Sequence, residues 1–454
     1  MDSPADYGRR GESVNAAEAS AATREDIWAT VSAGTQSTLV DSPPGAGKST
    51  LVREIGRRAR RHGQVPIVVQ TNDQADDTVR GFVADQRRGA TPVRIGRLHA
   101  GSYIPPDDLN SRPGVSFSSS INDLHDSEVI IAPAAKWATV SLDLAWPFAI
   151  IDEAYQMRSD ALLPIGAMME SLLLVGDPGQ LAPFTTADDT RFRGRPLSPL
   201  ETAAATILTT QPATARLALP VSWRLPSHAA SLISDAFYQT PFTAGTLPEE
   251  RHLRRGVTPL RRGRGADAVD GAIGCGWAYV ELDELPMPQT DPEAIDAIVD
   301  VVKELIEADI TIEDERGTRG LRPTDIAVGV THRDQRDHVR TTLQGTRDRT
   351  GLPVDEVIVD TANVLQGREF EIVVVWHPLS GRRDASQFHL DAGRLCVLLS
   401  RHRQACIVVS RGGIRNQLAG HAPTEPVWLG EAAPLLDGWH AHLAVLDHLV
   451  EHAV

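Results

Sequence analysis

Lysine is nearly absent from this sequence. Only Lys48, Lys136 and Lys303 occur, and the rest of the 45 basic residues in the 454-residue chain are arginine. Such a bias is typical of a GC-rich genome. The lysine ammonium group is nevertheless a compact point charge that the planar guanidinium of arginine does not imitate. A lysine that remains in this chain is therefore worth examining for a specific role.

Cysteine and long apolar runs are also scarce. The chain has 3 cysteines without a CxxC spacing, which argues against a disulfide framework and a structural zinc site. No segment approaches the roughly 20 apolar residues of a membrane span, and residues 1–22 lack the apolar core of a signal peptide. We expect a cytoplasmic protein with no membrane partner.

An excess of positive charge is missing as well. The formal net charge is −15, which excludes a protein that coats nucleic acid through bulk charge. One segment, Arg251–Arg264, carries six arginines and no acid. It could contact nucleic acid or form a solvated loop. Any nucleic-acid function must therefore depend on a local site.

Short apolar runs alternate with amphipathic stretches along most of the chain, as is typical of an α/β fold with parallel sheets. The expected strands are 38–40, 66–69, 129–132, 148–151, 172–175, 277–282, 326–330, 357–359, 372–376 and 407–409. The expected helices are 227–237, 292–308, 334–343 and 394–401, with a further packing helix near the C-terminus.

We expect three parts in the chain. Residues 1–22 are small and polar without periodicity, which predicts a disordered tail. Residues 23–220 and 221–454 then form two consecutive α/β domains, the second of them ending in the C-terminal helix. In parallel sheets of this kind, ligands bind at the carboxyl ends of the strands.

The segment TLVDSPPGAGKSTLV, residues 38–52, places a strand, a glycine-rich turn and a helix in the order that a phosphate-binding loop requires. Gly45 and Gly47 allow backbone N–H groups to face phosphate oxygens. Lys48 adds a charge at the β- and γ-phosphates, and Ser49 can ligate Mg²⁺. This is the specific role that arginine does not fill.

An apolar strand that ends in two acids, PFAIIDEAYQM at residues 147–157, is the expected partner of this loop. Asp152 would join Ser49 on Mg²⁺, and Glu153 would face the water that attacks the γ-phosphate. The alternative is a pair of carboxylates at a helix start, where the helix dipole favours negative charge. The pairing with the phosphate loop favours the catalytic interpretation.

Seven blocks in sequence order resemble the conserved motifs of superfamily 1 helicases. They are DSPPGAGKS, DEAYQ, LLLVGDPGQLAP, VSWRLPSH, TDIAVGVTHRDQ, DTANVLQGREFEIVVV and RLCVLLSRHRQACIVVS, spread over residues 25–410. They are most similar to subfamily B, in the branch of the nonsense-mediated-decay RNA helicase. This resemblance implies a minimal core of two tandem RecA-like P-loop domains with parallel sheets, and an ATP site in the cleft between them.

The resemblance also implies roles for individual residues around ATP. Gln180 would sense the γ-phosphate, while Arg224 and Arg401 would be arginine fingers from the second domain, which stabilise charge on the transferring phosphoryl group. Glu369 would bind the ribose. The residues implied to bind the cofactor are Pro44, Gly45, Ala46, Gly47, Lys48, Ser49, Thr50, Gln366, Gly367 and Glu369.

For nucleic acid, the resemblance implies polar side chains at strand ends. Thr71 and Asn72 belong to the first domain, and Thr331, His332 and Thr361 to the second. Hydroxyl and amide groups hold the sugar-phosphate backbone without the salt-sensitive grip of many cations. An acidic protein can therefore bind a single strand in this way.

Four positions depart from the helicase pattern. Ser42 replaces the first glycine of the phosphate loop, and Cys396 replaces an asparagine of motif VI. Glu25 stands near the usual adenine-binding glutamine, and a carboxylate cannot donate a hydrogen bond to the adenine ring. The threonine-rich motif Ic is missing from IIAPAAKWA. Adenine selectivity is the property most affected.

The predicted function is that of an ATPase: a helicase or translocase that moves 5′ to 3′ on single-stranded DNA or RNA and hydrolyses ATP with Mg²⁺. A second hypothesis is an ATP-gated nucleic-acid-binding or scaffold subunit without autonomous unwinding, beside a protein partner such as a nuclease. A third, a P-loop ATPase unrelated to nucleic acid, would require the later motifs to be coincidence.

Overall fold

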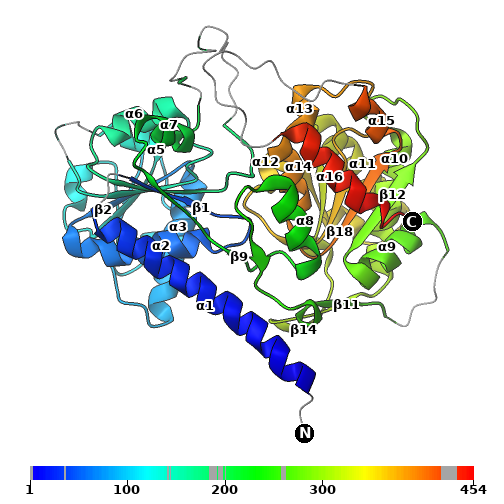
Figure 1. The fold of residues 1–454 in the computed structure, drawn as a ribbon, viewed down its shortest axis with the longest axis horizontal. Helices are drawn as coiled ribbons and strands as arrows, with labels where there is room; N and C mark the ends of the chain where they lie inside the picture. The colour runs from blue at the N-terminus through cyan, green and yellow to red at the C-terminus, as the bar shows by residue number, and fades with distance from the viewer. Residues whose placement is uncertain are drawn as a thin grey trace.

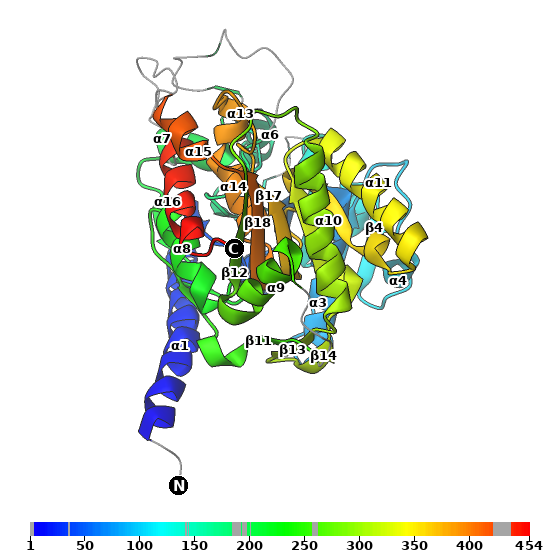
Figure 2. The same cartoon turned by 90° about the vertical axis from the view of Figure 1, so that its right-hand side faces the viewer.

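Two parallel sheets form the centres of two lobes (Figure 1). The computed structural model describes residues 4–34, 37–140, 143, 145–183, 192, 198–199, 201–256, 262–420 and 437–454, with side chains from residue 15 onward. Figure 2 shows the second lobe from the side, with α10 (Pro292–Glu307) and α11 (Arg333–Thr350) on one flank of its sheet. The predicted α/β class with parallel sheets is confirmed.

The first sheet has the strand order β4-β3-β5-β2-β6-β7-β1-β8 and pairs in parallel throughout. Its strands are β1 (Ser37–Asp41), β2 (Val65–Val69), β3 (Ile95–Leu98), β4 (Val115–Ser118), β5 (Val129–Pro133), β6 (Ala149–Asp152), β7 (Leu172–Gly176) and β8 (Ala215–Ala218). Because β6, β7 and β1 are neighbours, their carboxyl ends place the phosphate loop, the DEAYQ block and the GDPGQ block side by side.

Both faces of this sheet are buried. Alternate side chains of one strand enter different cores, as Leu39 and Val40 do in β1. One core is covered by α2 (Lys48–Ala59) and α3 (Asn72–Arg87), and the other by α5 (Ala134–Trp137), α6 (Ser159–Gly166) and α7 (Ala203–Thr210). The short helix α4 (Asp107–Asn110) lies beside β4.

The second sheet has the order β12-β18-β17-β15-β16 and is also parallel. Its strands are β12 (Trp277–Leu282), β15 (Ile326–Val330), β16 (Ile358–Thr361), β17 (Phe370–Trp376) and β18 (His402–Arg411). Three helices pack on one face, namely α9 (Arg264–Cys275), α10 and α11. The opposite face is covered by α8 (Ser227–Phe237), α12 (Ala362–Leu365), α14 (Ala392–Leu399) and α16 (Gly438–Val450).

Smaller elements join or flank the two lobes. A short parallel pair, β9 (Val221–Ser222) and β10 (Thr243–Ala244), follows the first sheet, and an antiparallel sheet is built in the order β11-β13-β14. The strands of that sheet are β11 (His252–Arg254), β13 (Thr311–Asp314) and β14 (Gly317–Gly320). Two further helices, α13 (Gln387–Leu390) and α15 (Ile414–Ala419), contact α16. No helix within the described ranges is long and apolar enough to span a bilayer.

The N-terminal segment differs from the expectation of a disordered tail over residues 1–22. Helix α1 (Pro4–Ser32) occupies most of that segment and projects from the first lobe (Figure 1). Residues 16–22 include five alanines, and alanine has the highest intrinsic helix propensity. Ile27 on the same helix is fully buried in the core beside β1, which anchors the C-terminal half of α1.

Candidate nucleotide site

The phosphate loop connects β1 to α2. Gly45 and Gly47 have φ of 73° and 88°, the left-handed conformation that glycine adopts without a Cβ clash. A Cβ atom on Gly47 would meet nothing within 4 Å, so the space beside it is open. Ser42 has no positive φ, and its backbone N–H donates to Gly176 O at 2.8 Å. Serine is therefore accommodated where related loops have glycine.

Lys48 lies opposite the two acids that end β6. Its Nζ is 3.7 Å from Asp152 Oδ1 and forms a closer ion pair with Glu153 Oε1. Burial opposes the charge on Lys48, but the carboxylates of Glu153, Asp152 and Asp177 outweigh burial and raise the pKa of the lysine. Burial raises the pKa of Asp152 to about 6, although Lys48 opposes this change. The fold therefore brings the three predicted residues together.

Glu153 is held in an unusual backbone conformation. Its φ of 59° lies in the left-handed region, which few residues other than glycine adopt. Its N–H donates to Asp152 Oδ1 at 2.9 Å. Oε2 of Glu153 is buried and has no hydrogen-bond partner. Such strain is concentrated at functional sites, and here it accompanies a buried carboxylate oxygen without a hydrogen-bond partner.

A chain of side chains links the first sheet to the second through Gln180. Gln180 Nε2 donates to Asp177, which follows β7, and Gln366 Nε2 of the second lobe donates to Gln180 Oε1 at 2.9 Å. Tyr238 OH donates to Asp177 Oδ1 at 2.6 Å. Burial raises the pKa of Asp177 to about 6, against the hydrogen bond from Tyr238 and the charges of Lys48 and Arg401.

Two residues among these hydrogen-bonded side chains, Asp177 and Tyr238, were not predicted from the sequence. Asp177 is the acid of the GDPGQ block, so the sequence contained a signal for it. Tyr238 lies directly after α8 outside the blocks that resemble helicase motifs, and no sequence signal marks it. Its hydroxyl also lies 3.7 Å from the Sγ of Cys396, the residue that replaces the motif VI asparagine. The cysteine therefore belongs to the contact between the lobes.

Arg401 is completely buried at the end of α14. Its Nε donates to Val397 O at 3.1 Å and its Nη2 to Ser400 Oγ at 2.8 Å, whereas Nη1 has no partner. Burial, with a smaller contribution from Arg224, lowers the pKa of Arg401 to about 10. A buried guanidinium nitrogen without an acceptor suits an anion that enters the site.

Arg224 lies against the phosphate loop. Residues 219–226, which connect β8 to α8 and are called the linker below, are bound to this loop. Trp223 N donates to Gly45 O at 3.0 Å, and Ser222 Oγ donates to Pro44 O at 2.5 Å. The Arg224 side chain points to Glu369, with Nε 3.4 Å from Oε2. Two residues with separate predicted roles, a phosphate contact and a ribose contact, are therefore paired with each other.

The residues fit ATP and Mg²⁺. Two buried atoms of the site, Oε2 of Glu153 and Nη1 of Arg401, have no hydrogen-bond partner, and open space adjoins Gly47. Ser49 is exposed at the start of α2, and Asp152 is the last residue of β6. One hydroxyl and one carboxylate, completed by phosphate oxygens and water, are a common ligand set for Mg²⁺.

The predicted nucleic-acid residues of the first lobe lie at the carboxyl end of β2. Thr71 and Asn72 are exposed, but both have partners within the chain. Thr71 caps α3 by accepting from Gln74 N at 3.2 Å. Asn72 Oδ1 accepts from Arg97 Nη2 at 2.8 Å. The fold therefore fixes both side chains at the strand end before any ligand arrives.

The second lobe repeats this arrangement after β15. Gln335 Oε1 accepts from the N–H groups of Thr331 and His332 at 3.1 and 3.0 Å, as Gln74 does from residues 70 and 71. His332 Nε2 lies 2.9 Å from His389 Nε2. Thr331 is 4% exposed and its Oγ1 has no partner, and Thr361 is 9% exposed at the end of β16. These two threonines are more buried than direct contacts with the sugar-phosphate backbone of a nucleic acid would require.

The described part of the basic segment Arg251–Arg264 combines one buried arginine with more exposed ones. Arg251 is buried and pairs with Glu315. Of the other arginines, residues 254, 255 and 264 pair with acids of the second lobe, and residues 257–261 lie outside the described part of the chain. Glu25 pairs with Arg58 near the C-terminal end of α2, away from the phosphate loop at the other end of that helix.

A family model described as AAA domain matches residues 204–412, a little under half of the chain. The match begins within α7 and ends just after β18, so it includes Arg224, Gln366 and Arg401. No curated protein matches the sequence.

Solved helicase structures show a weak similarity to the chain. A crystal structure of arterivirus nonstructural protein 10, a helicase, has a TM-score of 0.45 and 14% identity, covering 85% of this chain and 61% of that chain. Its complex with DNA has a TM-score of 0.43 and 13% identity, covering 82% and 61%. The PRRSV helicase has a TM-score of 0.41 and 14% identity, covering 88% and 58%. This chain spans about three fifths of the length of these proteins.

Proposed function

We propose that this chain is an ATPase of the superfamily 1 helicase type that moves 5′ to 3′ along single-stranded DNA or RNA. The observation that carries the proposal is the contact at Gln180. This residue binds Asp177 of the first lobe and Gln366 of the second, so a change at the phosphate site is coupled to the position of both lobes. The order of the sequence motifs and the family match over residues 204–412 support the proposal.

The residues of the cleft have distinct tasks in this proposal. Ser49 and Asp152 would hold Mg²⁺, which offsets phosphate charge when bound. Lys48 would exchange its ion pair with Glu153 for phosphate oxygens, and this exchange leaves the Glu153 carboxylate to orient water and accept its proton. Arg401, with its unpartnered Nη1, would contact the γ-phosphoryl oxygens from the second lobe.

Nucleic acid would lie across the carboxyl ends of β2, β15 and β16. The contacts would come from Thr71 and Asn72 in the first domain, residues 23–220, and from Thr331, His332 and Thr361 in the second, residues 221–454. Each turn of the ATP cycle would open and close the two domains and thereby shift one group of contacts relative to the other.

A second candidate function is an ATP-gated clamp or scaffold that works beside a partner protein such as a nuclease. The net charge of −15 and the internal ion pairs of Arg251, Arg254, Arg255 and Arg264 favour it. Both features leave little positive charge to hold a long nucleic-acid track.

ATP turnover in the presence of single-stranded DNA, single-stranded RNA and duplex tests the main proposal. We expect stimulation by at least one single strand. Lys48→Ala and Glu153→Gln should each lower kcat by roughly a hundred-fold or more, because both groups act on the reacting phosphate. Lys303→Ala is the matched control, since Lys303 lies on α10 within the second lobe. An ATP turnover rate that none of these nucleic acids changes would contradict the proposal of a motor.

Displacement of a strand from a tailed duplex separates the two candidates. A motor displaces a strand from a duplex that carries a 5′ single-stranded tail, and this displacement requires Glu153. A clamp retains the tailed duplex without strand release, and the Glu153→Gln variant gives the same result in this assay.

A further inference from the structure

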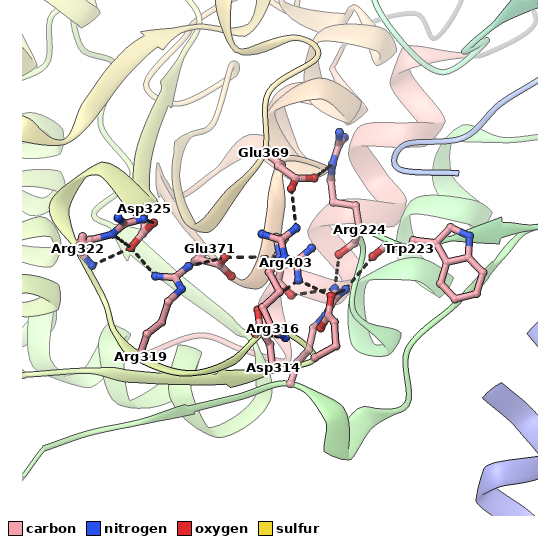
Figure 3. A network of polar contacts seen from close by, with 12 residues as sticks. Trp223, Arg224, Asp314, Arg316, Arg319, Arg322, Asp325, Glu369, Glu371 and Arg403 are labelled. Carbon is pink, nitrogen blue, oxygen red and sulfur yellow. Dashed lines mark hydrogen bonds and ion pairs between the residues drawn. The ribbon is translucent and has the colours of Figure 1, made fainter. Parts of the chain in front are cut away.

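The turn between β13 and β14 belongs to the same network of polar contacts as Trp223 and Arg224 of the linker (Figure 3). Residues 315 and 316 form this turn. Glu315 accepts hydrogen bonds from Arg251 Nε at 3.1 Å and from Arg403 Nη2 at 2.5 Å. Although burial acts in the opposite direction, these arginines lower the pKa of Glu315 to about 2. The turn is therefore fixed by charged contacts on both sides.

Arg251 connects Glu315 of this turn to the linker. Its side chain is 2% exposed. Nη2 donates to the carbonyl oxygen of Trp223 at 2.7 Å, and Nη1 donates to that of Arg224 at 2.5 Å. The backbone of Arg224 is therefore held, and its side chain is the part that can move.

The carboxylate of Glu369 is shared by two arginines from different elements. Its Oε2 lies 3.4 Å from Nε of Arg224, and its Oε1 lies 3.1 Å from Nη2 of Arg316 in the β13–β14 turn. The Arg224 side chain is 11% exposed and the Arg316 side chain 53% exposed. The more solvated arginine therefore competes for the acid that holds the more buried one (Figure 3).

We propose that Arg316 is a positioning residue that sets how readily Arg224 leaves Glu369 for the nucleotide phosphates. The inference rests on the proposed function, because it requires Arg224 to act on a phosphate. It adds a residue outside the helicase-like blocks, supplied by a hairpin between α10 and β15.

The direction of the effect follows from the shared carboxylate. A carboxylate that loses one of its two guanidinium partners binds the remaining one more firmly, since less of its charge is compensated. Without Arg316, Arg224 would stay on Glu369 for more of the catalytic cycle. Nucleotide entry itself would change little, because Arg316 does not contact the phosphate loop in this arrangement.

The test is a double-mutant cycle of nucleic-acid-stimulated ATP turnover on the full chain. Arg316→Ala should lower kcat roughly three-fold at nearly constant KM, as expected for a half-exposed ion pair. Arg316→Lys should restore most of the rate. In the background of Glu369→Gln, adding Arg316→Ala should have no effect on kcat. Arg322→Ala is the matched control, because Arg322 is an exposed arginine of the same network that pairs with Asp325.

Each other outcome overturns the inference. An unchanged kcat, or an effect on KM alone, shows that Arg316 does not govern Arg224. An equal loss in the Glu369→Gln background, or in Arg322→Ala, shows a structural role of the hairpin. If the wild-type chain hydrolyses no ATP while its melting temperature is normal, the proposed function fails together with the inference, and this result is distinct from the others.

Discussion

Gly45 and Gly47 both hold left-handed backbone conformations, but only Gly45 is enclosed by another part of the chain. A Cβ atom on Gly45 would overlap Cβ of Arg224 and lie 2.8 Å from its backbone N. We expect Gly47→Ala to cost about 1–2 kcal/mol of unfolding free energy through backbone strain. Gly45→Ala should cost roughly 1–3 kcal/mol more, because the linker must also move. Thermal unfolding of the two variants measures this difference.

Gly89→Ala is the control for that comparison. Gly89 has φ of 96° and no atom within 4 Å of an added Cβ, so it isolates the cost of strain far from the loop. Equal losses of melting temperature in Gly45→Ala and Gly89→Ala would contradict the close contact between the phosphate loop and the linker.

At the same scale, local chemistry determines which site residues a sequence predicts. Lys48, Asp152 and Glu153 were predicted because phosphate binding demands those residue types at fixed offsets from a strand end, and the structure places them within ion-pair distance. Arg224 and Glu369 are separated by 145 positions in the chain. No local pattern indicates that they pair, because their contact depends on how the linker meets the second lobe.

Arg251 connects the linker to the small antiparallel sheet, and its loss should destabilise the chain. Arg251→Ala leaves the carbonyl groups of Trp223 and Arg224, and the half-exposed Glu315 carboxylate, without the hydrogen bonds of a nearly fully buried guanidinium. We expect a cost of roughly 2–4 kcal/mol, visible as a lower midpoint of urea unfolding. Arg254→Ala on β11 should cost less than about 1 kcal/mol, because its side chain is 66% exposed and forms a surface ion pair with Glu313.

The same two variants decide what the basic segment does. If it is structural, neither arginine contributes to binding of single strands beyond its effect on stability. A weaker affinity and a shallower salt dependence in Arg254→Ala, at unchanged stability, would instead indicate a phosphate contact.

Apolar runs predicted strands of both sheets, including the edge strand β12, while less apolar strands went unpredicted. The expected strands 277–282 and 326–330 coincide with β12 and β15. Strands β4 and β8, at the two edges of the first sheet, are half exposed and have no continuous apolar run. Strand β3 contains Arg97, whose charge is matched in the interior by Asp76 at 2.9 Å. A buried charged residue of this kind interrupts the apolar pattern by which a strand is predicted from sequence.

At the scale of the whole molecule, the strand order was beyond what periodicity can indicate. In the first sheet β1 pairs with β7, which begins at Leu172, and with β8, which begins at Ala215. These partners are selected by packing over long sequence separations. The alternation of elements indicates only that the sheets are parallel and that their carboxyl ends carry the ligand sites.

Buried histidines are confined to the second lobe among the described residues. Burial lowers the pKa of His228 and His389 to about 4 and that of His442 to about 3, and it also holds the pKa of His377 and His402 well below the ordinary value. The unfolded chain takes up these protons first as the pH falls below about 6.5. The second lobe therefore loses stability on acidification. Asp177 changes the stability in the opposite direction. Because its pKa is raised in the folded state, the folded chain takes up this proton first, and acidification stabilises the fold there.

The two lobes should consequently respond differently to mild acid. At pH 5, neutral His228 alone costs the folded second lobe about 2 kcal/mol relative to pH 7, whereas protonation of Asp177 adds stability near β7. Hydrogen exchange measured at pH 7 and pH 5, corrected for the intrinsic exchange rates, checks this expectation. Peptides from β12 and β18 should lose protection, while those from β1 and β7 keep it. Earlier loss in β1 and β7 would show that acid opens the nucleotide site before the histidine-rich core, contrary to the pKa differences.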